Sequence, residues 1–283
     1  MALLNARVKG RLDPFATMTT KQKQIFYGIG GGSHTDHRML RHHEEIVKIA
    51  QFKSLSKKPT ILLMPTAHHN GIHPDLNQRQ FYKNRFTELG CNILEVLIGG
   101  VLHGETEDSD EIIHQKLDAS HCLFVLGGDT QLLLKLIHAR NLKGLFTDFY
   151  HNGLPFAGTS AGCIWFSKEC MSDSEFFHTP EKWKYIMLSG LDFLPAMNVH
   201  DNQGIREGDI SQIPRDRQFD AFMQKRDGGK ALAIDEFAAI CVTNNEQLEV
   251  ISFDNSGVQI VSSSSGNVYR ERIAKSINLS DYF

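Results

Sequence analysis

Short apolar runs alternate with segments of helical periodicity along most of the chain. The apolar runs end in glycine or other turn residues, which is typical of buried strands. They lie at 23–29, 60–65, 92–98, 121–128 and 153–159. Between them, apolar residues recur at three- and four-residue steps, which predicts helices at 37–52, 76–90, 107–120 and 129–142.

This alternation of strand and helix predicts an α/β fold. Right-handed crossovers between parallel strands place helices on both faces of a mostly parallel sheet. After residue 170 the order changes, and closely spaced strands with Asn-Asn and Asn-Ser-Gly turns at 230–271 predict antiparallel strands at the C-terminal edge of the sheet. Ligands of such folds gather at the carboxyl ends of the strands.

Composition places the chain among ordinary globular proteins. Its 283 residues are 41% hydrophobic, and 30 Lys and Arg against 33 Asp and Glu give a formal net charge of −3. This balance excludes a strongly basic nucleic-acid binder, and the length fits one α/β domain, predicted over 23–283. We interpret residues 1–22 as a disordered leader or extension. No run approaches the roughly 18 apolar residues of a membrane span, so no membrane partner is expected.

Cysteine usage favours a reducing compartment. The five cysteines are odd in number, widely spaced and mostly set in apolar surroundings. They are therefore interpreted as reduced core thiols, which predicts a cytoplasmic protein. A homodimer is compatible with the sequence but not indicated by it.

One local motif points to chemistry. Gly-Thr-Ser-Ala-Gly at 158–162 directly follows a predicted strand and precedes a segment able to start a helix. Glycines in a G-x-S-x-G elbow permit a sharp turn that lifts the Ser160 hydroxyl above the sheet and directs the Ala161 N–H at an incoming carbonyl oxygen. The alternative is a Gly/Ser turn with no nucleophile.

A second glycine turn lies one βα unit upstream, in Leu-Gly-Gly-Asp-Thr at 126–130. Adjacent parallel strands would bring the Gly128 N–H beside that of Ala161, and a tetrahedral oxyanion needs two such donors. Phosphate binding is the weaker interpretation. The chain lacks G-x-x-x-x-G-K-[ST] and a dinucleotide fingerprint, and Asp129 would repel an anion.

Together, these two turns, a histidine in Asn-Val-His-Asp at 198–201 and a glutamate in Ala-Ile-Asp-Glu-Phe at 233–237 resemble the dipeptidase E (aspartyl dipeptidase) and cyanophycinase family of serine peptidases. The resemblance covers about residues 24–261. It implies a fold similar to the class I glutamine amidotransferases, which is flavodoxin-like. It also implies a serine nucleophile completed by histidine and glutamate, with no metal or organic cofactor.

The resemblance implies Ser160 as nucleophile, His200 as general base and Glu236 as the acid that orients the imidazole. The acid has a rival in Asp235, because this chain has Asp-Glu-Phe where the family shows a Pro-Glu-Gly-like turn. Asp201 ranks below both, since neighbouring side chains on an extended segment point apart.

Substrate recognition is predicted from the same family. Members that prefer an N-terminal aspartate bind its carboxylate with arginine downstream of the histidine, where this chain has Arg215 and Arg217. Arg206 competes for the role, and surface salt bridging is the alternative for each arginine. Asp129 and Thr159 complete the predicted substrate-binding residues.

Two further groups of polar residues are candidates for lining the pocket. Asp173 and Glu175 follow the elbow helix, with a solvated acidic loop as the alternative. The loop after the second strand is predicted to face the substrate rather than a metal, because it matches no H-E-x-x-H or Cys/His pattern. Its polar residues are His68, His69, Asn70 and His73.

The sequence therefore predicts a serine exopeptidase that hydrolyses short peptides, foremost aspartyl dipeptides (Asp-X), through an acyl-enzyme. Two alternatives stay open. One is cyanophycinase-like hydrolysis of β-aspartyl-arginine peptides, and the other is a non-catalytic module on the same fold, in which Ser160 only hydrogen-bonds a ligand. An amidotransferase-like acyl hydrolase is disfavoured, because the elbow carries Ser160 and Cys163 lies one helical step inside.

Overall fold

The computed structural model describes residues 24–68, 76–99 and 106–283. The predicted leader at 1–22 and three residues of the histidine loop, His69, Asn70 and His73, lie outside these ranges. Within them, no helix is both long and apolar enough to cross a membrane.

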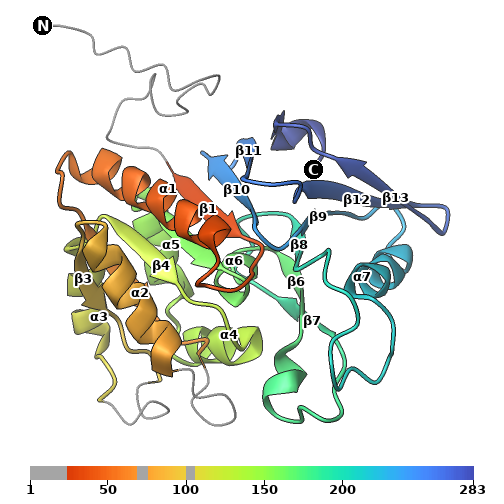
Figure 1. The fold of residues 1–283 in the computed structure, drawn as a ribbon, viewed down its shortest axis with the longest axis horizontal. Helices are drawn as coiled ribbons and strands as arrows, with labels where there is room; N and C mark the ends of the chain where they lie inside the picture. Colours follow the sequence, from red (N-terminus) through yellow and green to blue (C-terminus); the bar gives the residue numbers. More distant parts are fainter. Residues whose placement is uncertain (1–23, 69–75, 100–105) are drawn as a thin grey trace, which may run out of the picture.

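Five parallel strands form one side of an eight-stranded sheet, from β1 to the edge strand β3 (Figure 1). Their order across the sheet is β1, β5, β4, β2, β3. Each falls in a predicted apolar run: β1 (Ile25–Ile29), β2 (Thr60–Met64), β3 (Asn92–Glu95), β4 (Cys122–Val125) and β5 (Phe156–Thr159). Because all five run in the same direction, their carboxyl ends meet at one edge.

Three antiparallel strands extend this sheet beside β1. They are β10 (Ala238–Thr243), β11 (Gln247–Ser252) and β14 (Ser276–Asn278). Asn244 and Asn245 follow β10 with φ values of 54° and 56°, the conformation that a tight hairpin turn needs. Antiparallel strands at this edge of the sheet are thus confirmed, by β10 and β11 from the predicted range 230–271, whereas the other strands of that range lie elsewhere.

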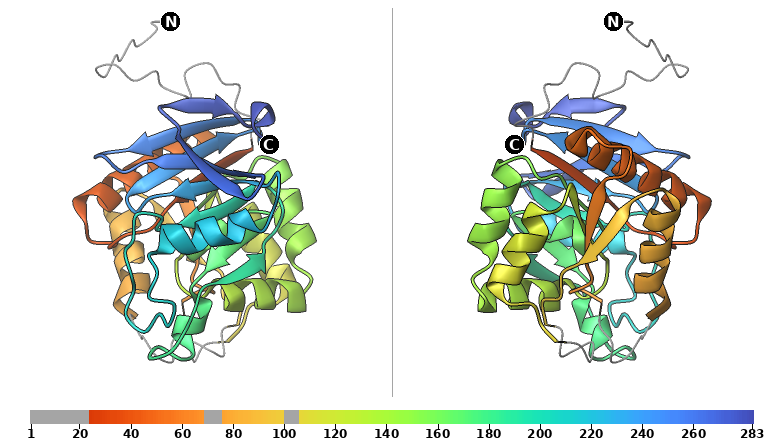
Figure 2. Two further views of the ribbon diagram at one scale, coloured as in Figure 1. Left: turned by 90° about the vertical axis from the view of Figure 1, so that its right-hand side faces the viewer. Right: turned by 90° about the vertical axis from the view of Figure 1, so that its left-hand side faces the viewer.

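Helices cover both faces of the sheet (Figure 2). One buried cluster joins one face to α1 (His37–Ser54) and α2 (Leu76–Glu88). Another joins the opposite face to α3 (Asp110–Asp118), α4 (Thr130–Ala139) and α5 (Lys143–His151). The apolar stripes of these helices account for this packing, and the predicted α/β class is confirmed.

The sequence pattern did not predict the second, six-stranded sheet. Its order is β13, β12, β9, β8, β6, β7. The strands are β6 (Glu169–Ser172), β7 (Ile186–Ser189), β8 (Ala196–Val199), β9 (Lys230–Ile234), β12 (Val258–Ser264) and β13 (Asn267–Arg272), and α7 (Arg215–Gln224) packs on them. Met197 and Leu232 lie in the same buried cluster as Phe26 and Phe156 of the first sheet, so the two sheets share a core.

Candidate active site

Three side chains at strand ends form a chain of hydrogen bonds. His200 Nε2 lies 2.9 Å from Ser160 Oγ, and His200 Nδ1 lies 2.7 Å from Glu236 Oε1. Ser160 follows β5, His200 follows β8, and Glu236 lies just beyond β9. In such an arrangement the imidazole can take a proton from the hydroxyl while the carboxylate balances the resulting charge.

Ser160 has a backbone conformation that side chains rarely adopt, with φ 53° and ψ −114° between β5 and the short helix α6 (Ala161–Ile164). Two glycines make the turn sterically possible. A Cβ on Gly158 would lie 2.0 Å from Gly162 O, and a Cβ on Gly162 would lie 2.0 Å from Val125 O. The glycine spacing of the motif therefore has a steric cause, and backbone strain at a single residue is typical of functional sites.

The residues at the carboxyl end of β1 form hydrogen bonds with all three of these segments. Successive carbonyl groups at 29–31 accept backbone hydrogen bonds from the segments that carry the three side chains. The pairs are Ser160 N–H to Ile29 O at 2.9 Å, His200 N–H to Gly30 O at 3.0 Å, and Phe237 N–H to Gly31 O at 3.0 Å. Sequence reasoning did not single out these residues, although Gly-Gly-Gly after a strand at the same sheet edge was a usable signal.

Two backbone amides lie beside the Ser160 turn. Because β4 pairs in parallel with β5, the glycine turn after β4 flanks the elbow, and a Cβ on Gly127 would lie 3.3 Å from Ser160 Cβ. Among the described residues, neither the Gly128 N–H nor the Ala161 N–H donates a hydrogen bond to another backbone group. Both amides are therefore free to donate to a ligand oxygen.

The structure brings one of the two rival acids to the imidazole. The hydrogen bond from His200 holds the pKa of the Glu236 carboxyl below its ordinary value, although burial acts in the opposite direction. The Glu236 N–H donates to Asn202 Oδ1 at 2.9 Å. Asp235 points elsewhere: its Oδ2 accepts a hydrogen bond from the Gly257 N–H at 2.8 Å, and burial raises its pKa.

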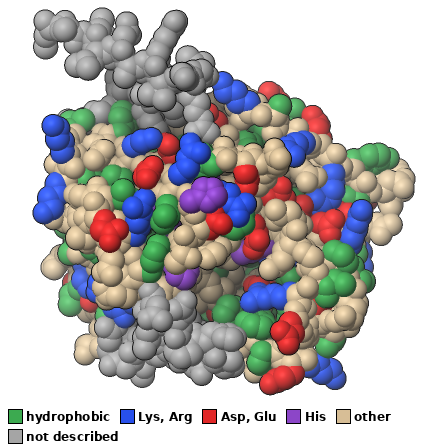
Figure 3. Space-filling view, viewed as in Figure 1, with side chains coloured by type: hydrophobic (Ala, Val, Ile, Leu, Met, Phe, Trp, Pro, Cys, Tyr) green, Lys and Arg blue, Asp and Glu red, His purple; other side chains and the backbone are tan. Residues whose placement is uncertain are grey.

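A pocket of about 400 Å³ opens beside Ser160. Figure 3 shows histidine side chains around a hollow near the centre of this face. Arg206 forms a short ion pair with Asp173 in the pocket wall, and its guanidinium lies 4.0 Å from the centre of the Phe176 ring. Gln203 also lines the pocket, and its buried Oε1 accepts no hydrogen bond from the described residues. Sequence reasoning missed Gln203 and Phe176, which lie in loops without a motif.

Arg215 lies behind this wall, only 1% exposed, at the first turn of α7. It donates to Asn198 Oδ1 at 3.1 Å, and its Nη1 lies 3.7 Å from Asp173 Oδ2. Burial would raise the pKa of the Asp173 carboxyl, but the charges of Arg215 and Arg206 outweigh burial and lower it. Asp173 is therefore a carboxylate between two guanidinium groups, and the cluster carries a surplus positive charge.

The other predicted substrate-binding residues are divided. Thr159 lines the pocket. Arg217 lies outside it, with its side chain 68% exposed and its Nη1 3.5 Å from Asp220 Oδ2. Asp129 is fully buried and caps α4, since its Oδ1 accepts a hydrogen bond from the Leu132 N–H at 3.0 Å. Of the four predicted residues, Thr159 lines the pocket, whereas Arg215, Arg217 and Asp129 do not.

Of the remaining candidate residues, one lines the pocket and the others make contacts elsewhere. His68 lines the pocket, whereas Glu175 accepts a hydrogen bond from the Lys184 N–H at 3.2 Å. Asp201 is buried against Arg270, 2.5 Å from its Nη1. No group of three His, Cys, Asp or Glu side chains within the described ranges could hold a metal ion.

Comparison with known proteins places this geometry in a family. The model of peptidase family S51 matches residues 28–250. Among solved structures, a peptidase from an acI-B1 Actinobacterium has a TM-score of 0.63 at 15% identity, over 92% of this chain and 98% of that one, so the two share a fold. A protein described as a peptidase E from Listeria monocytogenes EGD-e has a TM-score of 0.49 at 14% identity, over 82% and 100% of the two chains.

No curated protein sequence matches the chain. The family match spans well over half of its length and includes both glycine turns, the Ser160 elbow and the segments of His200 and Glu236. The chain therefore belongs to peptidase family S51, the dipeptidase E and cyanophycinase family, and is a serine peptidase.

Proposed function

We propose that this serine peptidase is an exopeptidase that hydrolyses aspartyl dipeptides with Ser160, His200 and Glu236 as its catalytic residues. The observation that supports this most is the pair of hydrogen bonds through His200, 2.9 Å to Ser160 Oγ and 2.7 Å to Glu236 Oε1, at the mouth of a pocket. Nucleophile and base within hydrogen-bond reach, with a third group orienting the base, are what acyl transfer requires.

The proposed reaction has two stages. Ser160 Oγ attacks the scissile carbonyl carbon while His200 takes the hydroxyl proton, and His200 then gives that proton to the leaving amine. The amine departs as the C-terminal amino acid of the dipeptide, and the aspartyl residue stays bound to Ser160 as an ester. Water, deprotonated by His200, attacks the ester carbonyl, and His200 returns the proton to Ser160 Oγ as the ester bond breaks and aspartate is released. The Gly128 and Ala161 amides would stabilise the oxyanion of each tetrahedral intermediate.

The charge of the pocket wall favours an acidic substrate residue. Arg206 and Arg215 oppose the single carboxylate of Asp173, so a substrate carboxylate would neutralise the surplus charge. Arg206 lines the pocket and can contact that carboxylate, while Arg215 adds its charge from behind the wall. Arg217 has no part in this proposal, because its side chain is exposed on α7.

Location in the cytoplasm is part of the same proposal. All five cysteines are buried and free, as expected for a protein from a reducing compartment. Immunoblotting of the chain in separated cell fractions tests this. Recovery of the protein in an oxidising compartment would contradict it.

The substrate proposal is tested by amino-acid release from Asp-Leu, Glu-Leu, Asn-Leu, Ala-Leu and β-Asp-Arg. We expect the highest kcat/KM for Asp-Leu, and a loss of about 10³-fold or more in Ser160→Ala. Ser56→Ala, at an exposed loop serine, is the matched control. A fluorophosphonate should label the wild type at Ser160 and leave Ser160→Ala unlabelled.

Each contrary outcome is distinct. Fastest turnover of β-Asp-Arg would replace the aspartyl-dipeptide proposal with a cyanophycinase-like one. Activity that survives Ser160→Ala would exclude Ser160 as the nucleophile, and a folded protein with neither turnover nor label would be a binding module.

Arg206→Met should lower kcat/KM for Asp-Leu by about tenfold or more and change kcat/KM for Asn-Leu little. Equal losses on both would contradict the role of Arg206.

A further inference from the structure

A tyrosine in the pocket beside Ser160 has no hydrogen-bond partner for its hydroxyl. Tyr82, on α2, lines this pocket and is only 1% exposed. Its hydroxyl forms no hydrogen bond with any residue in the described ranges, and it is not among the polar atoms that the protein encloses completely. Buried tyrosine hydroxyls usually have a partner, so this one indicates a ligand that enters the pocket.

The ring of Tyr82 is held by aromatic neighbours. Its centre lies 5.0 Å from that of Phe124 in β4, 5.2 Å from that of His43 in α1, and 5.7 Å from that of Phe81. Burial raises the pKa of the phenol, so the hydroxyl keeps its proton at neutral pH and can donate it to an acceptor. The protein therefore presents a neutral hydrogen-bond donor whose position is fixed by packing.

A second polar side chain lies one helical turn away on α2. Gln78 also lines the pocket, and residues four apart share one face of a helix. Its side-chain amide forms no hydrogen bond with any residue that the structure describes. Among the described lining residues, the Asp, Glu, Lys and Arg side chains are Asp173 and Arg206, and neither is on α2. The α2 wall therefore offers neutral donors.

Ser160 lies between two walls of this pocket. Tyr82 belongs to the buried cluster on the α1 and α2 face of the first sheet, whereas Met197 of the second sheet belongs to the cluster on the opposite face. Arg206 follows β8 and lines the pocket from the second sheet. Figure 1 shows α2 and β7 on opposite sides of α6, which begins directly after Ser160. If the aspartyl residue lies at Arg206, the leaving residue extends toward α2.

We propose that Tyr82 and Gln78 bind the free carboxylate of the leaving amino acid. This inference rests on the proposed peptidase function and adds a subsite to it. The leaving residue of a dipeptide carries its carboxylate on the carbon next to the scissile nitrogen, so this group enters the pocket with the scissile bond. A carboxylate that loses its water there needs hydrogen-bond donors. A longer peptide has an amide in this position, so the subsite favours dipeptides.

Two compounds test the subsite: Asp-Leu, and the α-aspartyl amide of 3-methylbutylamine, which is Asp-Leu without its terminal carboxylate. Tyr82→Phe should raise KM for Asp-Leu by about tenfold or more and leave kcat within about threefold, because bound substrate and transition state make the same contact. The variant should retain kcat/KM for the aspartyl amide within about threefold. Equal losses on both compounds would show that the hydroxyl only supports α2, and would overturn the inference.

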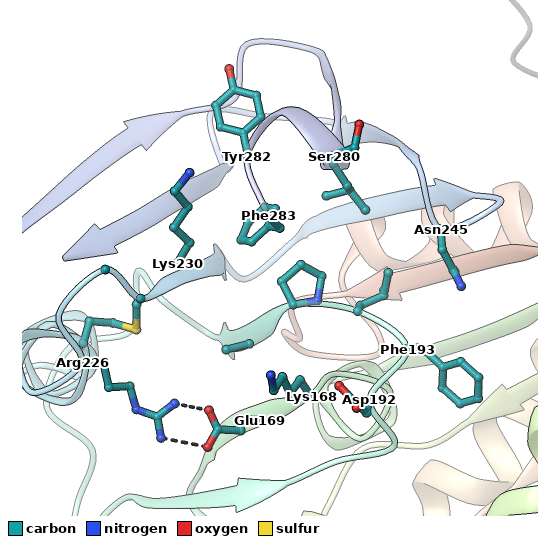
Figure 4. Close-up of a pocket in the computed structure, with 17 residues that line it drawn as sticks. Lys168, Glu169, Asp192, Phe193, Arg226, Lys230, Asn245, Ser280, Tyr282 and Phe283 are labelled. Carbon is teal, nitrogen blue, oxygen red and sulfur yellow. Dashed lines mark hydrogen bonds and ion pairs between the residues drawn. The ribbon is translucent and has the colours of Figure 1, made fainter. Parts of the chain in front are cut away.

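Tyr282→Phe is the matched control, because it removes the same atom from a separate cavity. That cavity, of about 780 Å³, lies at the opposite end of the second sheet and shares no lining residue with the pocket beside Ser160 (Figure 4). Tyr282→Phe should keep the wild-type KM for Asp-Leu. Gln78→Met, on the α2 wall, should raise this KM by about threefold or more and leave the aspartyl amide unaffected.

Calorimetric binding separates this inference from the peptidase proposal. Both compounds are titrated into Ser160→Ala and into the double variant Ser160→Ala with Tyr82→Phe. Asp-Leu should bind the single variant about tenfold or more tightly than the double variant, and the aspartyl amide should bind both equally.

The outcomes of the two measurements are distinct. Asp-Leu binding that depends on Tyr82, without turnover by the wild type, would support the subsite and contradict the peptidase proposal. Turnover of Asp-Leu with a Kd that Tyr82→Phe leaves unchanged would overturn the subsite alone. Absence of Asp-Leu binding would overturn both.

Discussion

The imidazole of His200 packs directly on the bare α-carbon of Gly31. A Cβ built on Gly31 would lie 2.1 Å from His200 Cε1 and 2.3 Å from Nε2, and the φ of Gly31 is 111°. Gly31, the second residue after β1, therefore shapes the wall against which the proposed general base rests. No other amino acid fits this position without moving the ring.

Gly31→Ala is expected to displace the imidazole from Ser160 and to lower kcat by about 10²-fold or more, since a shift of about 1 Å at a reacting group has such an effect. Steady-state kinetics on the preferred dipeptide measure this. Gly144→Ala is the matched control, because a Cβ there meets nothing within 4 Å. A Gly31→Ala enzyme with the wild-type rate would show that His200 tolerates the displacement.

The turn that carries Glu236 is held from α1. Phe237 has a φ of 63°, His42 Nε2 lies 3.0 Å from its carbonyl oxygen, and the guanidinium of Arg38 lies 3.5 Å from the centre of its ring. These contacts stabilise a left-handed conformation that a non-glycine residue rarely adopts. They support the turn at the position where the resembling family has glycine.

Arg38→Ala should loosen this turn and lower kcat by about tenfold while KM changes little, because in the proposed mechanism Glu236 orients the base and does not contact the substrate. The matched control is Arg41→Ala, one turn along α1, whose guanidinium stacks 3.8 Å from the Phe253 ring centre instead. Equal kinetic losses in both variants would point to a general effect of α1 and not to the Glu236 turn.

Gly162→Ala should destabilise the fold itself. Its Cβ would lie 2.0 Å from Val125 O, a rigid backbone atom in the middle of the sheet, so either the elbow or β4 must move. Overpacking of this kind costs about 1–3 kcal/mol in the free energy of unfolding, and more where the clash is with rigid backbone. Urea unfolding monitored by tryptophan fluorescence measures the loss, and a midpoint equal to wild type would contradict the steric argument.

Acid stability should depend on His43. Burial lowers its pKa to about 3, and both of its ring nitrogens lack a hydrogen-bond partner among the described residues. The unfolded chain binds the proton near the ordinary pKa of about 6.5, so between these values the unfolded state holds the extra proton. Stability through this residue is complete above pH 6.5 and falls by about 1.4 kcal/mol per pH unit on acidification toward pH 3.

His43→Leu removes this proton linkage. Between pH 7 and pH 5 the variant should lose about 2 kcal/mol less of its unfolding free energy than the wild type. Urea titrations at the two pH values measure the difference. His37→Gln, at an exposed histidine on the same helix, should lose as much as the wild type. Parallel pH profiles for His43→Leu and wild type would show that the buried imidazole is not the cause.

Local features of the chain were predictable because their causes are local. The alternation of apolar runs and helical periodicity depends on neighbouring residues, and it predicted the five parallel strands and the helices α1 to α4 between them, although it missed α5. The elbow at Ser160 was also readable, because its two glycines lie within two residues of the serine, at positions where close backbone packing leaves no room for a Cβ.

Placement of the second sheet depended on contacts far apart in the chain. β9 and β10 are separated by only three residues, yet β9 pairs with β8 and β12 while β10 pairs with β1. Both sequences are typical of short buried strands, and neither indicates which strand it pairs with. Strand pairing is a tertiary contact, so local periodicity identifies a strand without assigning it to a sheet.

The sequence alone determined a strand-turn-helix elbow with a serine, a histidine and an acidic pair in the order that a family resemblance implied. Only the tertiary structure decided which acid meets His200 and which arginine meets the pocket. Glu236 and Asp235 point to opposite sides of one segment, toward His200 and Gly257, and Arg217 lies exposed where Arg206 lines the pocket. Side chains one or two positions apart in a sequence point in different directions. Which groups each of them contacts is decided only when distant segments of the chain pack against it.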